Sequence, residues 1–225
     1  MKETTKKFFL SLLTALVSGI FIGVIVGVYQ LLLQYVVEFS TYMYTSSKWY
    51  LLLLMFILVM LAAAINYLII SRRKGVEGSG IPVLEVGVEG LMDIDYKYDI
   101  PLLIINSSLS TFAGFPLGSE GPSVVLGGKT GKLVNDIFHV DDKDNILMAA
   151  GCGFGAAFLS PIAGLAYMFE ENLHKINIKL LLRGIVMMVP AFIITSLINH
   201  HHLLSISNAE IISFNYYFVF IFLFM

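Results

Sequence analysis

Two long runs without a charged residue dominate the first third of the chain, at residues 8–37 and 49–71. Crossing the hydrocarbon core of a bilayer takes about 20 apolar residues, so each run predicts a membrane-spanning helix. A secretory signal has an apolar stretch of only about 7–15 residues, and the first run is far longer. We therefore expect the first run to be retained as a spanning helix.

The pattern changes after residue 75. Acidic residues interrupt residues 76–99 and exclude a spanning helix there, and a short amphipathic helix fits residues 81–87 between two loops. The later apolar segments are short, or interrupted by Gly and Pro; they are residues 100–117, 122–138, 146–159, 162–173 and 178–197. Such segments predict discontinuous, tilted helices around a site at the middle of the membrane. The expected fold class is therefore an all-α polytopic membrane protein.

Basic residues flank the two spanning runs unevenly. Lys6 and Lys7 precede the first run, and Arg72, Arg73 and Lys74 follow the second, whereas residues 38–48 carry one lysine. Loops rich in Lys and Arg stay on the cytoplasmic side. This bias predicts a cytoplasmic N-terminal tail, residues 1–7, and a cytoplasmic loop at residues 72–80.

Composition agrees with the membrane interpretation. Of the 225 residues, 57% are hydrophobic and only 13% are charged, about half the charged share of a soluble domain. The net charge of −2 gives no reason to expect a nucleic-acid partner. Cys152 is the single cysteine, which excludes a disulfide within the chain, and we expect it to be a small buried apolar residue.

One segment combines a tight turn with a helix start and an acidic residue, Gly118-Ser119-Glu120-Gly121-Pro122. The glycines allow a ligand to approach the backbone, and proline suits the first turn of a helix. The N–H groups at the start of such a helix, with its positive dipole end, attract an anion. Glu120 lies between apolar segments, and an ionisable residue at membrane depth marks a functional site. A helix cap on an exposed loop is the alternative.

A second turn of the same design is Gly78-Ser79-Gly80-Ile81-Pro82. The Ser79 hydroxyl and nearby backbone N–H groups are neutral donors. Neutral donors stabilise a permeating anion without holding it too tightly to leave. An ordinary helix start explains this segment equally well.

Three other patterns resemble known functional motifs, but each has a simpler explanation. Gly151, Gly153 and Ala156 match the dinucleotide fingerprint G-x-G-x-x-A, with Glu170 or Glu171 near its acidic position, but the preceding residues do not form a strand. Close helix packing explains these small residues better. The Gly127-Gly128-Lys129-Thr130 segment lacks the first glycine of a phosphate-binding loop, and His200-His201-His202 fits a loop at a membrane edge. No nucleophile is paired with a base, so we expect no enzymatic activity, no cofactor and no metal.

Together, Gly78–Pro82, Gly118–Pro122 and the segment at residues 151–171 with Ser160-Pro161-Ile162-Ala163-Gly164 resemble the CLC family of chloride channels and chloride/proton exchangers. The resemblance covers nearly the whole chain, but only the N-terminal half of the family's membrane domain. It implies half of an inverted-repeat fold, a homodimer in the bilayer with an interface near the segments after Pro161, and the plasma (inner) membrane of a prokaryote.

The resemblance also assigns roles to residues. Ser79 would coordinate the central chloride, with backbone groups of Gly80, Ile81, Gly121, Ser123 and Val124 supplying further contacts. Glu120 would be the gating glutamate, which occupies the outer anion position until it is protonated or displaced. Glu171 matches the intracellular proton glutamate of exchangers and favours exchange over passive conduction, and a solvated helix end is its alternative.

Two departures from the family pattern bear on function. Ser119 stands where the family usually has Arg or Lys. The loss of that positive charge weakens the attraction of the site for an anion. The family's second half, with its G-x-F-x-P segment and anion-coordinating tyrosine, is absent, and the chain stops within the apolar run at residues 216–225. We expect a piece of a longer protein that exchanges chloride for protons. A passive voltage-gated chloride channel and a non-transporting remnant are the alternatives.

Overall fold

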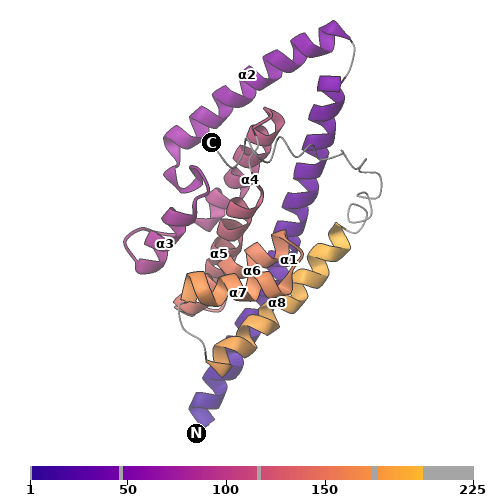
Figure 1. Ribbon diagram of the computed structural model, residues 1–225. Helices are drawn as coiled ribbons and strands as arrows, with labels where there is room; N and C mark the ends of the chain where they lie inside the picture. The colour runs from indigo at the N-terminus through magenta and orange to yellow at the C-terminus, as the bar shows by residue number, and fades with distance from the viewer. Residues whose placement is uncertain (1, 46–47, 116–117, 174–176, 200–225) are drawn as a thin grey trace, which may run out of the picture.

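The computed structural model describes residues 2–45, 48–115, 118–173 and 177–199. These residues form helices and no strand (Figure 1). In chain order the helices are α1 Lys2–Thr45, α2 Trp49–Arg72, a 3₁₀ turn Lys74–Val76, α3 Ile81–Glu89, α4 Tyr96–Phe112, α5 Glu120–Ile137, α6 Lys143–Ala157, α7 Pro161–Tyr167, a π-helical turn Met168–Leu173, and α8 Ile178–Ile198. The predicted all-α fold with several short helices is confirmed.

Three of the described helices are long and apolar enough to cross a bilayer, namely α1, α2 and α8. The two charge-free runs account for α1 and α2, as predicted. The prediction was wrong for residues 178–197, because α8 continues through Pro190 for 21 residues. Proline is tolerated inside a membrane helix when neighbouring helices cover the backbone it disturbs, and here Pro190 packs on Gly19 of α1.

Helices α1 and α8 run side by side and in the same direction (Figure 1). Gly19, Gly23 and Gly27 recur at every fourth position of α1 and face α8. A Cβ at Gly23 would lie 2.9 Å from the Cα of Ala191, so only glycine allows this approach. Small residues at this spacing let membrane helices pack backbone to backbone.

Helices α5 and α6 cross just as closely. A Cβ at Gly127 would lie 3.0 Å from the Cα of Gly153, and one at Gly155 would lie 2.8 Å from the Cα of Gly164 in α7. The glycines that imitated a nucleotide fingerprint are therefore packing residues inside a helix, as the membrane interpretation predicted. Cys152 is fully buried among them, also as predicted.

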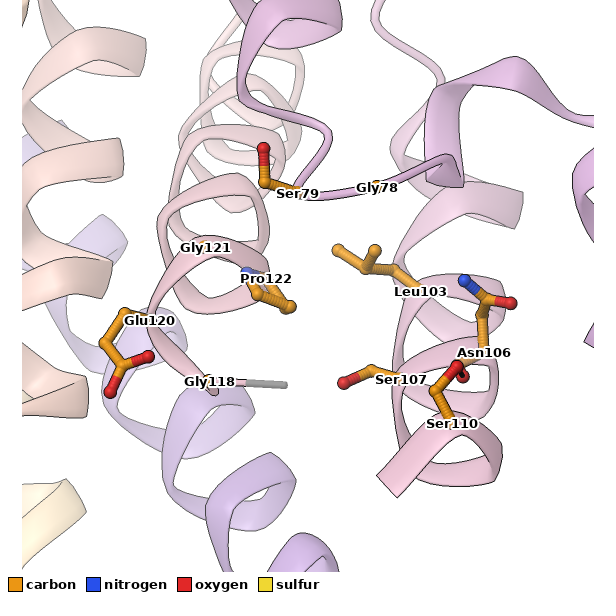
Figure 2. A pocket seen from close by; sticks show the side chains of 10 residues that line it. All are labelled: Gly78, Ser79, Leu103, Asn106, Ser107, Ser110, Gly118, Glu120, Gly121 and Pro122. Carbon is orange, nitrogen blue, oxygen red and sulfur yellow. Dashed lines mark hydrogen bonds between the residues drawn. The ribbon is translucent and has the colours of Figure 1, made fainter. Parts of the chain in front are cut away.

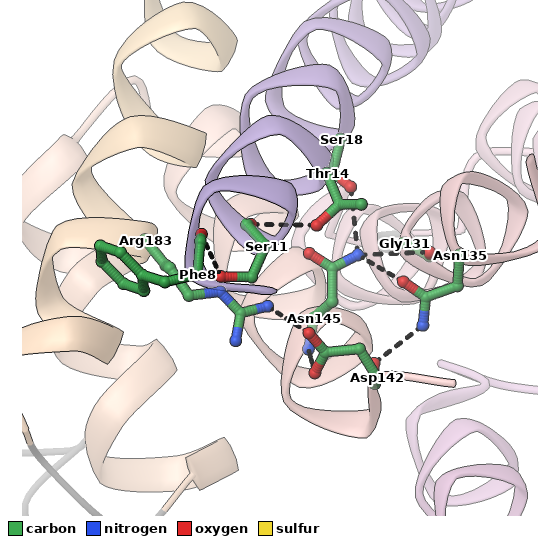
Figure 3. A network of polar contacts seen from close by, with 9 residues as sticks. All are labelled: Phe8, Ser11, Thr14, Ser18, Gly131, Asn135, Asp142, Asn145 and Arg183. Carbon is green, nitrogen blue, oxygen red and sulfur yellow. Dashed lines mark hydrogen bonds and ion pairs between the residues drawn. The ribbon is translucent and has the colours of Figure 1, made fainter. Parts of the chain in front are cut away.

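A buried polar network joins α1, α5, α6 and α8 (Figure 3). Arg183 of α8 pairs with Asp142 at 2.5 Å, and the Asp142 carboxylate also caps α6 by accepting from the Asn145 N–H. The Asn145 side chain donates to Asn135 of α5 at 2.9 Å and to Ser18 of α1 at 3.2 Å. These bonds tie the four helices to one another where water is excluded, and only the Asn145 Oδ1 and Arg183 Nε atoms of these side chains are buried without a partner among the described residues.

Candidate functional site

The segment between α2 and α3 turns sharply at two glycines. Gly78 and Gly80 have φ values of 60° and 72°, a left-handed conformation that favours glycine. The Gly80 N–H donates to the Glu77 carbonyl at 3.1 Å, and the Ile81 N–H donates to the Ser79 hydroxyl at 3.4 Å. The turn thus presents Ser79 at the start of α3.

The second turn leads directly into α5, whose first residue is Glu120. The Ser123 N–H donates to the Ser119 carbonyl at 3.0 Å, which closes the first helical turn. The Glu120 carboxylate folds back over Gly118, where any Cβ would collide with its Oε2 atom. The first N–H groups of a helix have no partner within it, so Glu120 lies beside a positive helix end.

These two turns, 40 residues apart in sequence, touch each other. A Cβ at Gly121 would lie 3.0 Å from the Cβ of Ser79, and one at Gly80 would lie 3.2 Å from Cγ2 of Val125. A cavity of about 340 Å³ opens beside this contact (Figure 2). Its lining residues are Gly78, Ser79, Leu103, Asn106, Ser107, Ser110, Gly118, Glu120, Gly121 and Pro122. The structure therefore brings Ser79, Glu120 and Gly121 together.

The other predicted site residues are distributed differently. Gly80 lines a second, more open cavity of about 480 Å³ on the other side of Ser79. The side chains of Ser123 and Val124 are buried away from both cavities, Val124 against α3 and α6. The Ile81 side chain is half-buried outside both cavities. At these positions only the backbone remains a candidate ligand for an anion.

Glu171 lies in the π-helical turn that follows α7. Its side chain is outside the part of the chain that the structure describes, as are residues 200–225 with the three histidines and the last apolar run. Helical backbone at residues 168–173 agrees with the predicted apolar segment. The role of Glu171 stays a prediction.

Sequence reasoning missed one wall of the cavity. Asn106, Ser107 and Ser110 follow each other on one face of α4, and the Ser107 hydroxyl is hydrogen-bonded to the Tyr29 hydroxyl of α1 at 2.6 Å. The Asn106 amide donates to the Val76 carbonyl at 3.2 Å, next to the Ser79 turn. The run of polar residues that begins at Asn106, directly after the apolar residues 100–105 of α4, was the signal that could have revealed the wall.

Sequence reasoning also missed a buried ion pair below the Ser79 turn. Lys129 of α5 and Asp99 of α4 meet at 2.6 Å, with side chains only 3% and 8% exposed. The Asp99 carboxylate packs on Gly75, where a Cβ would lie 2.5 Å from its Oδ2 atom. The pair therefore links the start of α4, the middle of α5 and the loop that carries Ser79.

A second, more exposed ion pair joins the residue after α2, where this loop begins, to the residue before α4. Arg73 and Asp95 meet at 2.7 Å. Partial burial raises the pKa of Asp95, but the hydrogen bonds from Arg73 and from the Tyr98 N–H outweigh it, so this pKa is lowered. The hydrogen bond to Asp95 likewise raises the pKa of Arg73. Both groups stay charged near neutral pH and hold the end of α2 against the start of α4.

Known proteins resemble this chain over most of its length. The family model described as "Voltage gated chloride channel" matches residues 61–224. The protein named "H(+)/Cl(-) exchange transporter ClcA" in Cronobacter sakazakii is 34% identical over 154 residues, which are 64% of this chain and 33% of that protein. Its namesake in Vibrio vulnificus is 31% identical over 168 residues, 71% of this chain and 36% of that protein.

A solved structure has the same fold. The crystal structure of "a slow cyanobacterial Cl-/H+ antiporter" superposes with a TM-score of 0.75 at 24% identity, covering 84% of this chain and 46% of that one. The chain spans about a third of the length of the curated relatives it matches. The predicted resemblance to the N-terminal half of this fold is thereby confirmed.

Proposed function

Because the chain belongs to the voltage-gated chloride channel family, we propose that it moves chloride across a membrane in exchange for protons, with Glu120 as the gate. The two ClcA relatives are named as exchangers of these ions. The observation that carries the proposal is the cavity where Ser79 and Glu120 lie together at the abutting starts of α3 and α5.

The coupling follows from competition for one positive site. An ionised Glu120 carboxylate and a chloride ion both favour the free N–H groups at the start of α5. When a proton neutralises the carboxylate, that attraction falls and chloride can replace it. When chloride leaves, the carboxylate can ionise again and return. One residue thus makes the movement of one ion depend on that of the other.

Further parts of the proposal rest on the family alone. Ser79 holds the central chloride with the backbone near Gly80, Ile81, Gly121, Ser123 and Val124, and Glu171 passes protons on the intracellular side. The protein is a homodimer in the inner membrane of a prokaryote, with a cytoplasmic N-terminus. Glu120, rather than a bound cofactor, carries the proton in this mechanism.

Proteoliposomes provide the test. The product of the whole reading frame is reconstituted, and an outward chloride gradient is applied while the internal pH is followed. Exchange predicts that chloride efflux drives proton uptake and that the reversal potential changes with the pH gradient. A passive channel ignores the pH gradient, and a non-transporting remnant gives no chloride flux above protein-free vesicles. Either result would overturn exchange.

Ser119 offers a second prediction, because it precedes the α5 N-terminus where the family usually has a cation. Ser119→Arg should lower the chloride concentration for half-maximal flux roughly fivefold, since two unit charges about 4 Å apart attract by about 1 kcal/mol in water. The control is Thr41→Arg, at an exposed position on α1 outside the cavity. Equal effects of the two variants would mean that the charge acts only through the whole surface.

A further inference from the structure

The Ser79 turn separates two cavities, and one acidic residue lines each of them. Glu120 lines the cavity of about 340 Å³ in Figure 2. Glu77 lines the second cavity of about 480 Å³, which we call the open cavity. Gly78 and Ser79 belong to both linings. An anion held at Ser79 would therefore lie between two carboxylates, and the proposed exchange uses only one of them.

Glu77 is the one charged residue among the described residues that line the open cavity. The rest of that lining consists of glycine, Ser79 and three apolar residues, Pro82, Val83 and Met92. None of the ion pairs between side chains that the structure describes includes Glu77. The open cavity therefore presents a negative charge beside an otherwise neutral wall.

Two cations close to this turn are already paired with other carboxylates. Arg73 meets Asp95 at 2.7 Å, and Lys129 meets Asp99 at 2.6 Å. Each pair carries no net charge, so neither balances the charge of Glu77.

The backbone of the turn keeps Glu77 beside Ser79. The Glu77 carbonyl accepts from the Gly80 N–H at 3.1 Å, and Gly78, with a φ of 60°, turns the chain between them. Two residues span at most about 7 Å of chain, so the backbones of Glu77 and Ser79 are no farther apart than this. In water, a unit charge about 7 Å from an anion changes its binding constant roughly threefold.

We propose that Glu77 sets the affinity of the Ser79 site for anions that enter through the open cavity, by repelling them with its negative charge. This inference rests on the proposed function, in which Ser79 holds chloride. An anion that is held less tightly leaves sooner, so the charge favours release into the open cavity. Glu77 thus differs from Glu120, because it acts through charge at a distance and takes no part in proton coupling.

A series of charges at position 77 tests this role. The product of the whole reading frame is reconstituted in proteoliposomes, and chloride flux is measured far below the half-saturating concentration. At an ionic strength of about 10 mM, Glu77→Gln should raise this flux about two- to threefold. Glu77→Lys should raise it about five- to sevenfold, because reversing the charge doubles the electrostatic change. Glu77→Asp keeps the charge and should have less than half the effect of Glu77→Gln.

Two further measurements separate a charge effect from a structural one. The differences should vanish in about 1 M of a salt with an impermeant anion, where the Debye length falls to about 3 Å. The number of protons exchanged per chloride should be the same in the whole series. If Glu77→Gln and Glu77→Asp lower the flux alike at both salt concentrations, Glu77 only holds the turn together. If Glu77→Gln loses proton coupling, Glu77 carries protons. Either result overturns the inference.

Glu85→Lys is the matched control for Glu77→Lys. Glu85 is an exposed carboxylate of α3 that lines neither cavity. This variant should change the flux much less than Glu77→Lys at low ionic strength. Equal effects of the two lysine variants would mean that the charge acts through the whole surface, and Glu77 would have no role of its own.

Failure of the proposed function is recognised separately from failure of this inference. Chloride flux without proton coupling overturns exchange but still reports the effect of Glu77 on that flux. If the unmodified protein gives no flux, transport is wrong, and chloride binding to the purified protein, measured by calorimetry, tests Glu77 alone. In that measurement Glu77→Gln should lower the dissociation constant about two- to threefold at low ionic strength. An unchanged dissociation constant would overturn the inference.

Discussion

Glu120→Ala should retain chloride flux and abolish chloride-driven proton uptake. Alanine cannot be protonated, and it cannot occupy the positive α5 N-terminus that Glu120 lies beside. Chloride then meets no competing carboxylate, so its passage no longer depends on a proton. The number of protons taken up per chloride released should fall at least about tenfold, and proton uptake should reach the background of protein-free vesicles. Loss of a catalytic acid or base typically lowers a rate about a hundredfold or more.

Two further variants serve as a mimic of the protonated state and as a control for Glu120→Ala. Glu120→Gln imitates the protonated carboxyl group in size and should behave like the alanine variant, with flux but no coupling. Glu85→Ala removes an exposed carboxylate of α3 that lines neither cavity and should couple normally. Coupling that survived in Glu120→Ala would assign the proton pathway to another residue and end the proposed mechanism.

The sequence predicted the helices and the two turns well, because those features depend on neighbouring residues. Charge-free runs marked α1 and α2, and glycines followed by proline marked the starts of α3 and α5. α8 was missed as a spanning helix, because Pro190 was counted as an interruption. The continuity of α8 depends on its packing along α1, through contacts 168 residues apart in sequence such as that between Gly23 and Ala191.

The candidate site was only partly predictable for a similar reason. Ser79 and Glu120 could be named from their turns, and the structure brings them to one cavity. Ser123 and Val124 follow in the same helix, but a helix rotates successive side chains by about 100°, so theirs turn into the core. The polar wall that α4 contributes is hydrogen-bonded to Tyr29 of α1 and to Asn66 of α2, and nothing in a local pattern shows that Tyr29 reaches Ser107.

Lys129 illustrates what a local pattern conceals. As part of Gly127-Gly128-Lys129-Thr130 it resembles only the end of a phosphate-binding loop, and that match fails. The structure places it in the middle of α5, paired with Asp99 thirty residues earlier. A lysine inside an apolar helix needs an acidic partner. Asp99, at the start of the preceding apolar segment, was the available signal.

Lys129→Met should therefore destabilise the protein more than any single substitution in the Glu120 cavity. Removing one partner of a buried ion pair leaves the other charged and unsolvated, which typically costs about 3–5 kcal/mol in free energy of unfolding. Asp99, which lies against Gly75 in the loop that carries Ser79, would then keep only its longer contact with Arg73 at 3.9 Å. The variant should consequently lose chloride affinity along with stability, as measured by unfolding in mixed detergent micelles and by flux in vesicles.

The same helix provides the matched control. Lys132 pairs with Asp136 at 2.6 Å, but with side chains 35% and 40% exposed, and such a pair contributes at most about 1 kcal/mol. Lys132→Met should therefore be nearly neutral. Adding Asp99→Asn to Lys129→Met removes the stranded charge and should recover much of the lost stability, because replacing both partners of a buried pair is far less costly than breaking it. If Lys129→Met destabilises the protein no more than Lys132→Met, then Arg73 or water compensates the charge of Asp99, and the Lys129–Asp99 pair does not hold the Ser79 turn in place.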